Sequence, residues 1–180
     1  NIDVSVSNPV ATPPGGTPLP QYQGEPSIDL NPLDPDNLVA ASNNRAGNVV
    51  TAYLSTDGGL TWDDRPLTNF VNGTNYAESE HPSVAFDRGN RAYVGYVARN
   101  PGVDSAIVVA RSDDGGNTYT QFTEVATSNA PGPGPNPAGS LDDFPSIVAD
   151  DLTAIHDGTP NRFLNRVYAS WTRSNFFGPG

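Results

Sequence analysis

The chain has 180 residues, a formal net charge of −11 and no cysteine. Its nine basic residues are all arginine, and aspartate far outnumbers glutamate among its twenty acidic residues. An acidic surface disfavours nucleic acid as a partner, and the lack of cysteine excludes disulfides, thiolate metal sites and a cysteine nucleophile. No apolar run is long enough for a membrane-spanning helix. The 18 glycines and 18 prolines predict many turns and few helices.

The first residues, 1–20, predict an N-terminal strand over Ile2 to Val6, followed by a proline-rich connection from Asn8 to Pro20. The sequence starts at Asn1 rather than at methionine, and its composition is acidic, free of lysine and rich in turn formers. We therefore expect a secreted or cell-surface protein whose leader has been removed, or a piece of a longer chain.

Two sequence signals repeat along the chain at nearly the same spacing. The tripeptide Pro-Ser-Ile at 26–28 recurs as Pro-Ser-Val at 82–84 and as Pro-Ser-Ile at 145–147. The segment 55–62 recurs at 112–119, with Ser, Asp, Gly-Gly and Thr in matching places. Because two unrelated signals share one period, we interpret the chain as a series of structural repeats.

Each repeat contains short runs rich in valine, tyrosine and isoleucine, bounded by Gly, Asn or Asp, and these predict strands. The clearest runs are 38–42, 49–55, 91–98, 106–112, 120–126 and 166–173. With the Pro-Ser run as the first strand, a repeat reads as four antiparallel strands, which is the make-up of a propeller blade. A β-sandwich of about seven strands is the alternative, but it does not explain why strands and turns repeat together.

The predicted fold is therefore an all-β propeller of four-stranded antiparallel blades, with about two and a half blades in this sequence. The first blade takes residues 21–75, the second 76–129, and a partial third 141–180, after a Pro/Gly-rich loop at 130–140. Propellers close with four to eight blades. We expect the remaining blades in sequence outside these residues or in another chain.

The repeated turn resembles the Asp-box, or bacterial neuraminidase repeat, with the pattern Ser-x-Asp-x-Gly-x-x-Trp. The first copy matches at Ser55, Asp57, Gly59 and Trp62, and the second at Ser112, Asp114 and Gly116, with Tyr119 in place of the tryptophan. The resemblance implies a sialidase-like propeller, with six or seven blades when complete. The resemblance also implies that both aspartates lie away from the substrate face and are not catalytic. A structural role suits them, because a carboxylate can accept hydrogen bonds from the N–H groups of its own turn.

Sialidases of this superfamily use three arginines on the substrate carboxylate, an Asp as general acid/base and a Tyr with a Glu partner as nucleophile. Their first arginine lies in an Arg-Ile-Pro type segment. No such segment occurs here, and Arg65-Pro66 follows the first Asp-box instead of preceding it. The sequence therefore does not predict sialidase activity for this segment.

Acidic residues stand just before each Pro-Ser run: Glu25, Glu80, Asp142 and Asp143. If these runs are the innermost strands, the acids surround one mouth of the propeller channel. Such a ring could hold Ca²⁺ through oxygen ligands, with these four residues as metal candidates. Glu25, Glu80 and Asp143 are also catalytic candidates, as the carboxylate pair of a glycosidase. The alternative is a solvated acidic rim without a ligand, with His81 exposed beside Glu80.

Taken together, these patterns predict an extracellular binding or scaffolding module that recognises a carbohydrate or a protein surface. A glycoside hydrolase of sialidase-like fold is the alternative function. No cofactor is required by either interpretation, and Ca²⁺ is the candidate ion.

Overall fold

The computed structural model describes residues 23–44, 48–101, 103–129, 139–154 and 158–176, which form strands and turns. The all-β prediction is confirmed, and no helix long and apolar enough to cross a membrane occurs in these ranges. The strands are Gln23–Asn31 (β1), Asp34–Asn44 (β2), Val49–Ser55 (β3), Asp63–Pro66 (β4), Phe70–Val71 (β5), Thr74–Asn75 (β6), Glu78–Phe86 (β7), Ala92–Asn100 (β8), Asp104–Ser112 (β9), Gln121–Asn129 (β10), Gly139–Ala149 (β11) and Val167–Phe176 (β12).

The strands pair with their neighbours in sequence, so the sheets are antiparallel meanders. Strands β1 to β4 form one four-stranded sheet in chain order, and β7 to β10 form a second. Strands β11 and β12 form a two-stranded third sheet, and β5–β6 is a separate short hairpin. None of these sheets closes on itself.

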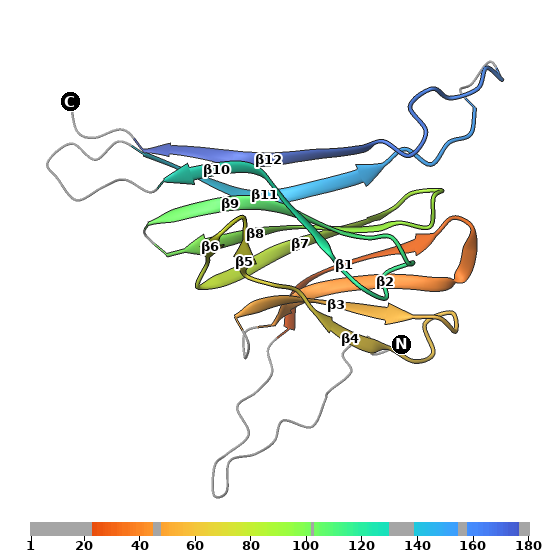
Figure 1. Cartoon of the computed structure of the whole chain (residues 1–180), viewed down its shortest axis with the longest axis horizontal. Coiled ribbons are helices and arrows are strands. Elements are labelled where there is room, and N and C mark those ends of the chain that lie inside the picture. The colour runs from red at the N-terminus through yellow and green to blue at the C-terminus, as the bar shows by residue number, and fades with distance from the viewer. Residues whose placement is uncertain (1–22, 45–47, 102, 130–138, 155–157, 177–180) are drawn as a thin grey trace, which may run out of the picture.

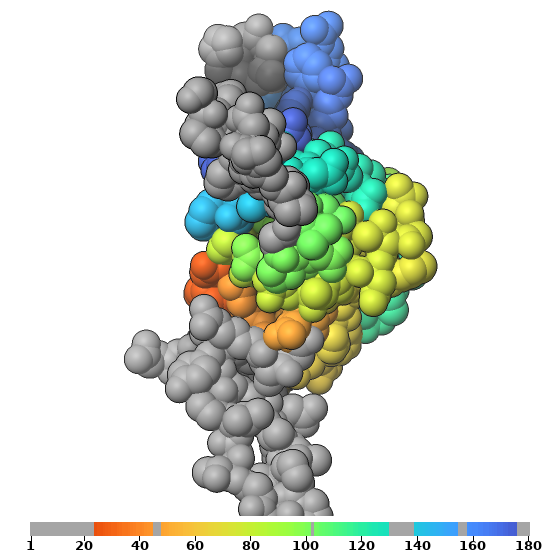
Figure 2. Space-filling view, turned by 90° about the vertical axis from the view of Figure 1, so that its left-hand side faces the viewer, coloured from red at the N-terminus to blue at the C-terminus, as the bar shows by residue number. Residues whose placement is uncertain are grey.

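The three larger sheets are stacked. In Figure 1, β1–β4 lie at the bottom, β7–β10 in the middle and β11–β12 at the top. The view turned by a quarter, in Figure 2, keeps the same order of orange, green and blue segments. Strand β7 contacts both β1 and β11, so the first strands of the three sheets lie side by side. Sequence positions that are equivalent in the repeats are thereby brought close together in space.

The main apolar core lies between the first two sheets. It joins Val39 and Val50 of the first sheet to Val94, Tyr96 and Val108 of the second, all with almost no exposed surface. Burying one such side chain stabilises the fold by about 1.5–3 kcal/mol. A smaller cluster joins the second sheet to the third. The runs rich in valine, tyrosine and isoleucine that predicted the strands therefore also supply side chains that pack one sheet against the next.

Two glycines mark places where neighbouring sheets approach closely. A Cβ atom on Gly116 would lie 2.3 Å from Cγ2 of Val39, in the first sheet. A Cβ atom on Gly95 would lie 2.8 Å from Cγ2 of Ile147, in the third sheet. Side chains from the adjacent sheet fill the space above each of these glycines.

Some boundaries differ from those predicted. Gly139 and Ser140, predicted to end the loop 130–140, belong to β11, and the rest of that predicted loop lies outside the described residues. The predicted strand and connection at 1–20 also lie outside them. The β5–β6 hairpin was not predicted. Its turn holds Asn72 and Gly73, both with positive φ, as tight hairpins require.

Candidate functional site

The first strand of each large sheet carries the same backbone irregularity just before its proline. Glu25, His81 and Phe144 precede Pro26, Pro82 and Pro145, and their φ angles are 55°, 55° and 49°. Strand register shifts at each of these places. Positive φ is uncommon for residues other than glycine, and a bulge of this kind turns a side chain out of the regular alternation. Three equivalent bulges thus present three side chains in a shared region.

Four of the side chains in this region form an acid–histidine cluster, made of Glu25, Glu80, His81 and Asp143. The ring of His81 is central: Nε2 lies 3.1 Å from Oε1 of Glu25, and Nδ1 lies 2.5 Å from Oδ1 of Asp143. Nδ1 is also 3.9 Å from Oε1 of Glu80. The ring stacks on Phe144 with 4.2 Å between centroids, and only 13% of the His81 side chain is exposed. The expectation of an exposed His81 was wrong.

Asn43 of β2 holds the cluster from the first sheet. Its Nδ2 donates to Oε2 of Glu25 at 2.6 Å, and its Oδ1 accepts from the backbone N–H of His81 at 2.8 Å. One amide side chain therefore fixes both a carboxylate of its own sheet and the bulge of the next sheet. These two hydrogen bonds keep the Glu25 carboxylate directed at the His81 ring.

Arg99 of β8 forms ion pairs with two acidic residues on the other side of the cluster. Its Nε donates to Oε1 of Glu78 at 2.7 Å, and its Nη2 lies 2.7 Å from Oε1 of Glu80. Burial raises the pKa of Glu80; the charges of Arg99 and His81 lower it in part, and the carboxylates of Glu78 and Asp143 raise it again. Glu80 therefore holds a proton more readily than an ordinary glutamate does.

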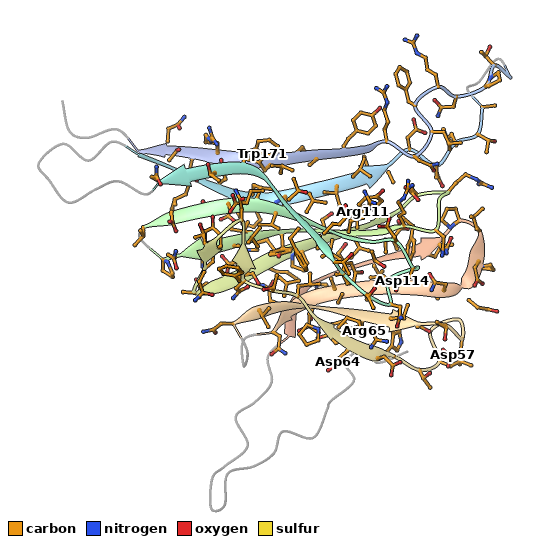
Figure 3. All side chains as sticks on the ribbon, viewed as in Figure 1. Asp57, Asp64, Arg65, Arg111, Asp114 and Trp171 are labelled. Carbon is orange, nitrogen blue, oxygen red and sulfur yellow. The ribbon has the colours of Figure 1, made fainter. Side chains whose placement is uncertain are left out.

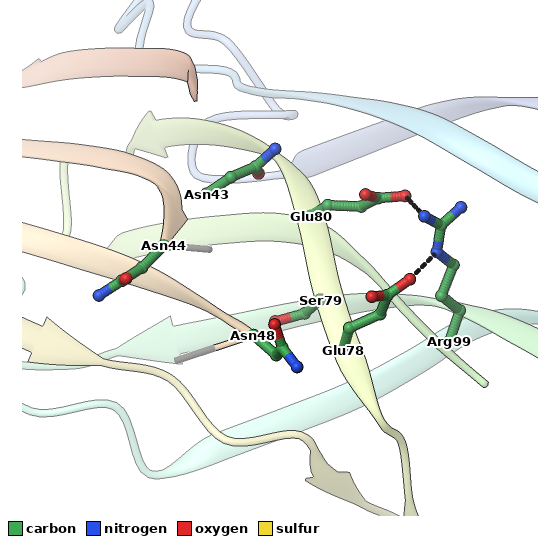
Figure 4. A pocket seen from close by; sticks show the side chains of 7 residues that line it. All are labelled: Asn43, Asn44, Asn48, Glu78, Ser79, Glu80 and Arg99. Carbon is green, nitrogen blue, oxygen red and sulfur yellow. Dashed lines mark hydrogen bonds and ion pairs between the residues drawn. The ribbon is translucent and has the colours of Figure 1, made fainter. Parts of the chain in front are cut away.

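A polar pocket of about 360 Å³ opens beside the cluster, between the first and second sheets. Figure 4 shows Glu78 and Glu80, two residues apart on strand β7, reaching the Arg99 guanidinium. The lining side chains are all polar: Asn43, Asn44, Asn48, Glu78, Ser79, Glu80 and Arg99. Amides, carboxylates and a guanidinium supply both donors and acceptors to anything that enters.

The predicted site residues are therefore brought together only in part. Glu25, Glu80 and Asp143 meet at the cluster, as an arrangement around a shared mouth requires. Asp142 does not: its side chain is completely buried, and its two oxygens accept bonds of 2.6 and 2.7 Å from Arg173. Because residues alternate in direction along β11, Asp142 and Asp143 point to different sides. Asp142 therefore lies outside the cluster, paired with Arg173.

Three atoms of the cluster are placed so that they could hold one metal ion. Glu80, His81 and Asp143 each offer a ligand atom, and these atoms lie within 4.8 Å of one another. An imidazole nitrogen with two carboxylates suits Zn²⁺ or Mn²⁺, whereas Ca²⁺ prefers oxygen ligands alone. Glu25, on the opposite ring nitrogen, stands where an outer carboxylate orients a ligating histidine. The nitrogen ligand is what the sequence-based expectation of Ca²⁺ left out.

The two repeated turns have one hydrogen-bonding pattern. Oγ of Ser55 donates to Oδ1 of Asp57 at 2.8 Å and accepts from the N–H of Gly59 at 2.8 Å. The Asp57 carboxylate also accepts from the N–H and hydroxyl of Thr61, at 2.9 and 2.6 Å. The bonds from Thr61 and then Ser55 lower the pKa of Asp57 to about 2. The carboxylate thus closes its own turn.

The second turn repeats these bonds with Ser112, Asp114, Gly116 and Thr118. Burial alone would raise the pKa of Asp114, but the bonds from Ser112 and Thr118 outweigh it and lower this pKa to about 2. The aromatic residues differ. Trp62 donates from Nε1 to the Gly59 carbonyl at 3.1 Å, whereas the ring of Tyr119 packs against the main core.

These turns lie far from the cluster. The N–H of Gly58 donates to the carbonyl of Asp36, near the start of β2, and that of Gly115 to the carbonyl of Asn90, between β7 and β8. Each turn therefore lies beside the connection from the first to the second strand of its sheet. Figure 3 shows Asp57 and Asp114 toward the same end of the molecule. The cluster, by contrast, lies where the first strands begin. Neither aspartate takes part in the pocket.

The sequence analysis did not identify Asn43, Glu78 or Arg99 as site residues, and it expected His81 to be exposed beside Glu80. His81 had a usable signal, because it stands directly before Pro82 as Glu25 stands before Pro26. Arg99 had none, because its partners are set by the pairing of Glu78 with Arg99 across β7 and β8.

No protein-family model matches this chain, and no curated protein matches it at a significant level.

Proposed function

We propose that the chain is part of an Asp-box β-propeller, with the first two sheets as complete blades and β11–β12 as the start of a third. Two identical turn patterns, the stacking of the sheets and the adjacency of β1, β7 and β11 support this architecture. In a propeller the first strand of each blade lines the central channel. The acid–histidine cluster then lies at one mouth of that channel, and a secreted or cell-surface location fits such a module.

We propose further that the polar pocket binds a carbohydrate. The observation that carries this is the lining itself, in which amides, carboxylates and Arg99 face one volume of about 360 Å³. Sugar hydroxyls both donate and accept, so they can satisfy such a lining, whereas an apolar ligand would leave buried polar groups unpaired. Side chains such as Glu80 and Arg99 are already fixed by their ion pair, which lowers the cost of ordering them on binding.

The charge of the site narrows the ligand class. Glu25, Glu78, Glu80 and Asp143 surround the pocket and the cluster, and the whole chain carries a formal charge of −11. A sugar with its own carboxylate would be repelled there. We therefore propose a neutral or amino sugar.

Calorimetric titration with neutral, amino and sialylated oligosaccharides tests this ligand. Binding of the first two classes and rejection of the third is expected, and Asn48→Gly should weaken it about tenfold or more by removing one lining amide. Asn48 has a φ of 51°, which glycine adopts freely, so the backbone is preserved. Asn72→Gly is the matched control, since Asn72 has a φ of 49° in a hairpin outside the pocket. Equal affinity of both variants for the sugar would show that the sugar does not bind in this pocket.

A glycoside hydrolase is the second candidate, and the raised pKa of Glu80 favours it. A general acid must hold its proton near the working pH, and a retaining mechanism places a second carboxyl group about 5–5.5 Å away. The ligand oxygens of Glu80 and Asp143 lie within 4.8 Å of each other. Turnover of aryl glycosides that is abolished in both Glu80→Gln and Asp143→Asn would establish the hydrolase. Binding of a sugar without turnover would reject the hydrolase and support the binding module.

We also propose a divalent transition metal as a ligand of Glu80, His81 and Asp143. Zn²⁺ or Mn²⁺ should raise the melting temperature, and Ca²⁺ should do so less, because a ligand that binds only the folded state stabilises it. His81→Gln should remove the effect of Zn²⁺. A melting temperature that none of the three ions changes would show that these residues do not form a metal site.

A further inference from the structure

The stack of sheets has two ends, and the repeat shows what each end is shaped to contact. At the interface between the first and second sheets, Val84 and Phe86 of β7 are only 7% and 3% exposed. They belong to the same buried cluster as Val39 and Ala41 of β2. Oγ of Ser27 also accepts from the N–H of Val84 at 3.0 Å.

The interface between the second and third sheets repeats this arrangement. Ile147, the equivalent of Val84, is 6% exposed and packs with Ala85 and Tyr93. Oγ of Ser83 accepts from the N–H of Ile147 at 3.0 Å, as Ser27 does one sheet earlier. Two successive interfaces therefore use equivalent side chains and an equivalent serine hydrogen bond.

At the beginning of the stack, no sheet formed by the described residues covers the same inserting side chains. Ile28 and Leu30 stand two and four residues after Pro26, as Val84 and Phe86 do after Pro82. Yet they are 54% and 51% exposed. We call the surface around them the start face.

The other end carries the matching receiving positions, also uncovered. Val148 and Tyr168 of the third sheet pair across β11 and β12, as Ala85 and Tyr93 pair across β7 and β8. Ala85 and Tyr93 are 3% and 8% exposed, but Val148 and Tyr168 are 59% and 48% exposed. We call the surface around Val148 and Tyr168 the end face.

We propose that the start face of one copy of this chain docks on the end face of a second copy, head to tail. Both halves of a contact that the molecule already makes twice internally are present on the same chain. Ile28 and Leu30 then pack on Val148 and Tyr168, and the Ser146 hydroxyl accepts from the N–H of Ile28. Such a contact is heterologous, so repeated copies close into a ring or extend as a filament. It is independent of the ligand that the pocket binds.

Sedimentation velocity of the full chain at rising concentration tests this docking, with salt added to screen the net charge of −11. The average mass should rise above that of the monomer. Ile28→Asp and Val148→Asp should each sediment as monomers, because each destroys one face. Mixed in equal amounts, they should form a one-to-one dimer and nothing larger, since one intact start face and one intact end face remain.

Controls separate docking from unfolding. Val103→Asp introduces the same charge at a residue that is 61% exposed in the turn between β8 and β9, and it should associate like the unaltered chain. Leu30→Asp is a second variant of the start face. Circular dichroism should show folded spectra for all variants, and an unfolded variant could not restore dimers on mixing. A monomeric unaltered chain at its highest soluble concentration would overturn the proposal, as would a mixture that stays monomeric.

Discussion

Nδ1 of His81 lies 2.5 Å from Oδ1 of Asp143, although the two residues are 62 positions apart and belong to different sheets. On its other side, Nε2 of the same ring lies 3.1 Å from Glu25 in the first sheet. One imidazole therefore joins side chains from three sheets. The bulge before each proline makes this meeting possible, because it turns residues of adjacent first strands toward one another.

Asp143→Asn should destabilise the fold. It removes a charged partner from a histidine that is only 13% exposed, and breaking a bond of this kind costs about 1–3 kcal/mol. The free energy of unfolding in urea measures the loss. Asp151→Asn, outside the cluster, is the matched control and should change stability by less than about 0.5 kcal/mol. Equal effects of the two changes would show that the cluster contributes nothing to stability.

The repeated turns should make the protein sensitive to acid. The folded-state pKa values of Asp57 and Asp114 are lowered to about 2, so the unfolded chain takes up protons at a higher pH than the folded one. Their contribution to stability is therefore complete above about pH 4 and is lost as the pH falls toward 2. Urea titrations between pH 6 and pH 2 should show a shallower fall for Asp57→Asn and Asp114→Asn than for the unaltered chain. An equal loss of stability with falling pH in the variants and the unaltered chain would contradict the role of these carboxylates in closing the turns.

Glu80 should act in the opposite direction. Its pKa is raised in the folded state, so the folded protein binds this proton more readily than the unfolded chain does. Its contribution to stability therefore becomes less favourable as the pH rises through the folded pKa. The stability of Glu80→Gln relative to the unaltered chain should rise from acidic to neutral pH. A relative stability that falls over this range would show that the Arg99 ion pair outweighs burial.

Substitution of Gly116 tests the stacking of the first two sheets. Gly116→Ala places a methyl group 2.3 Å from Val39 and also strains a φ of +95°, so a loss of at least about 2 kcal/mol is expected. Gly73→Ala meets the same φ strain, at +86°, but no atom within 4 Å, and should cost only about 1 kcal/mol. Losses of similar size in urea melts would mean that the contact with Val39 is absent in solution.

Local patterns predicted much of this fold. The runs of valine, tyrosine and isoleucine predicted β3 at its observed bounds, and β8, β9 and β12 to within a few residues. The shared period of Pro26, Pro82 and Pro145 predicted that the acids before them are related, and Glu25, Glu80 and Asp143 do meet. These successes depend on the composition of each run and on turn chemistry, which are properties of neighbouring residues.

The remaining features depend on contacts between distant segments. The sequence cannot separate Asp142 from Asp143, because which of the two faces Arg173 depends on the register of β11 against β12. The pairing of Arg99 with Glu78 and Glu80 and the bond from Asn43 to Glu25 likewise join different strands. Such pairs depend on how the strands and sheets lie against one another, which the sequence alone does not give.

Nuclear magnetic resonance titration of the isotope-labelled chain with a neutral oligosaccharide tests the central claim most directly. The proposed site predicts saturable shifts in the side-chain amide signals of Asn43 and Asn48 and in the Nε–H signal of Arg99. The signals of Thr61 and Thr118, in the distant turns, should stay unchanged. Shifts confined to those turns, or no shift with any neutral or amino sugar, would contradict carbohydrate binding at this pocket.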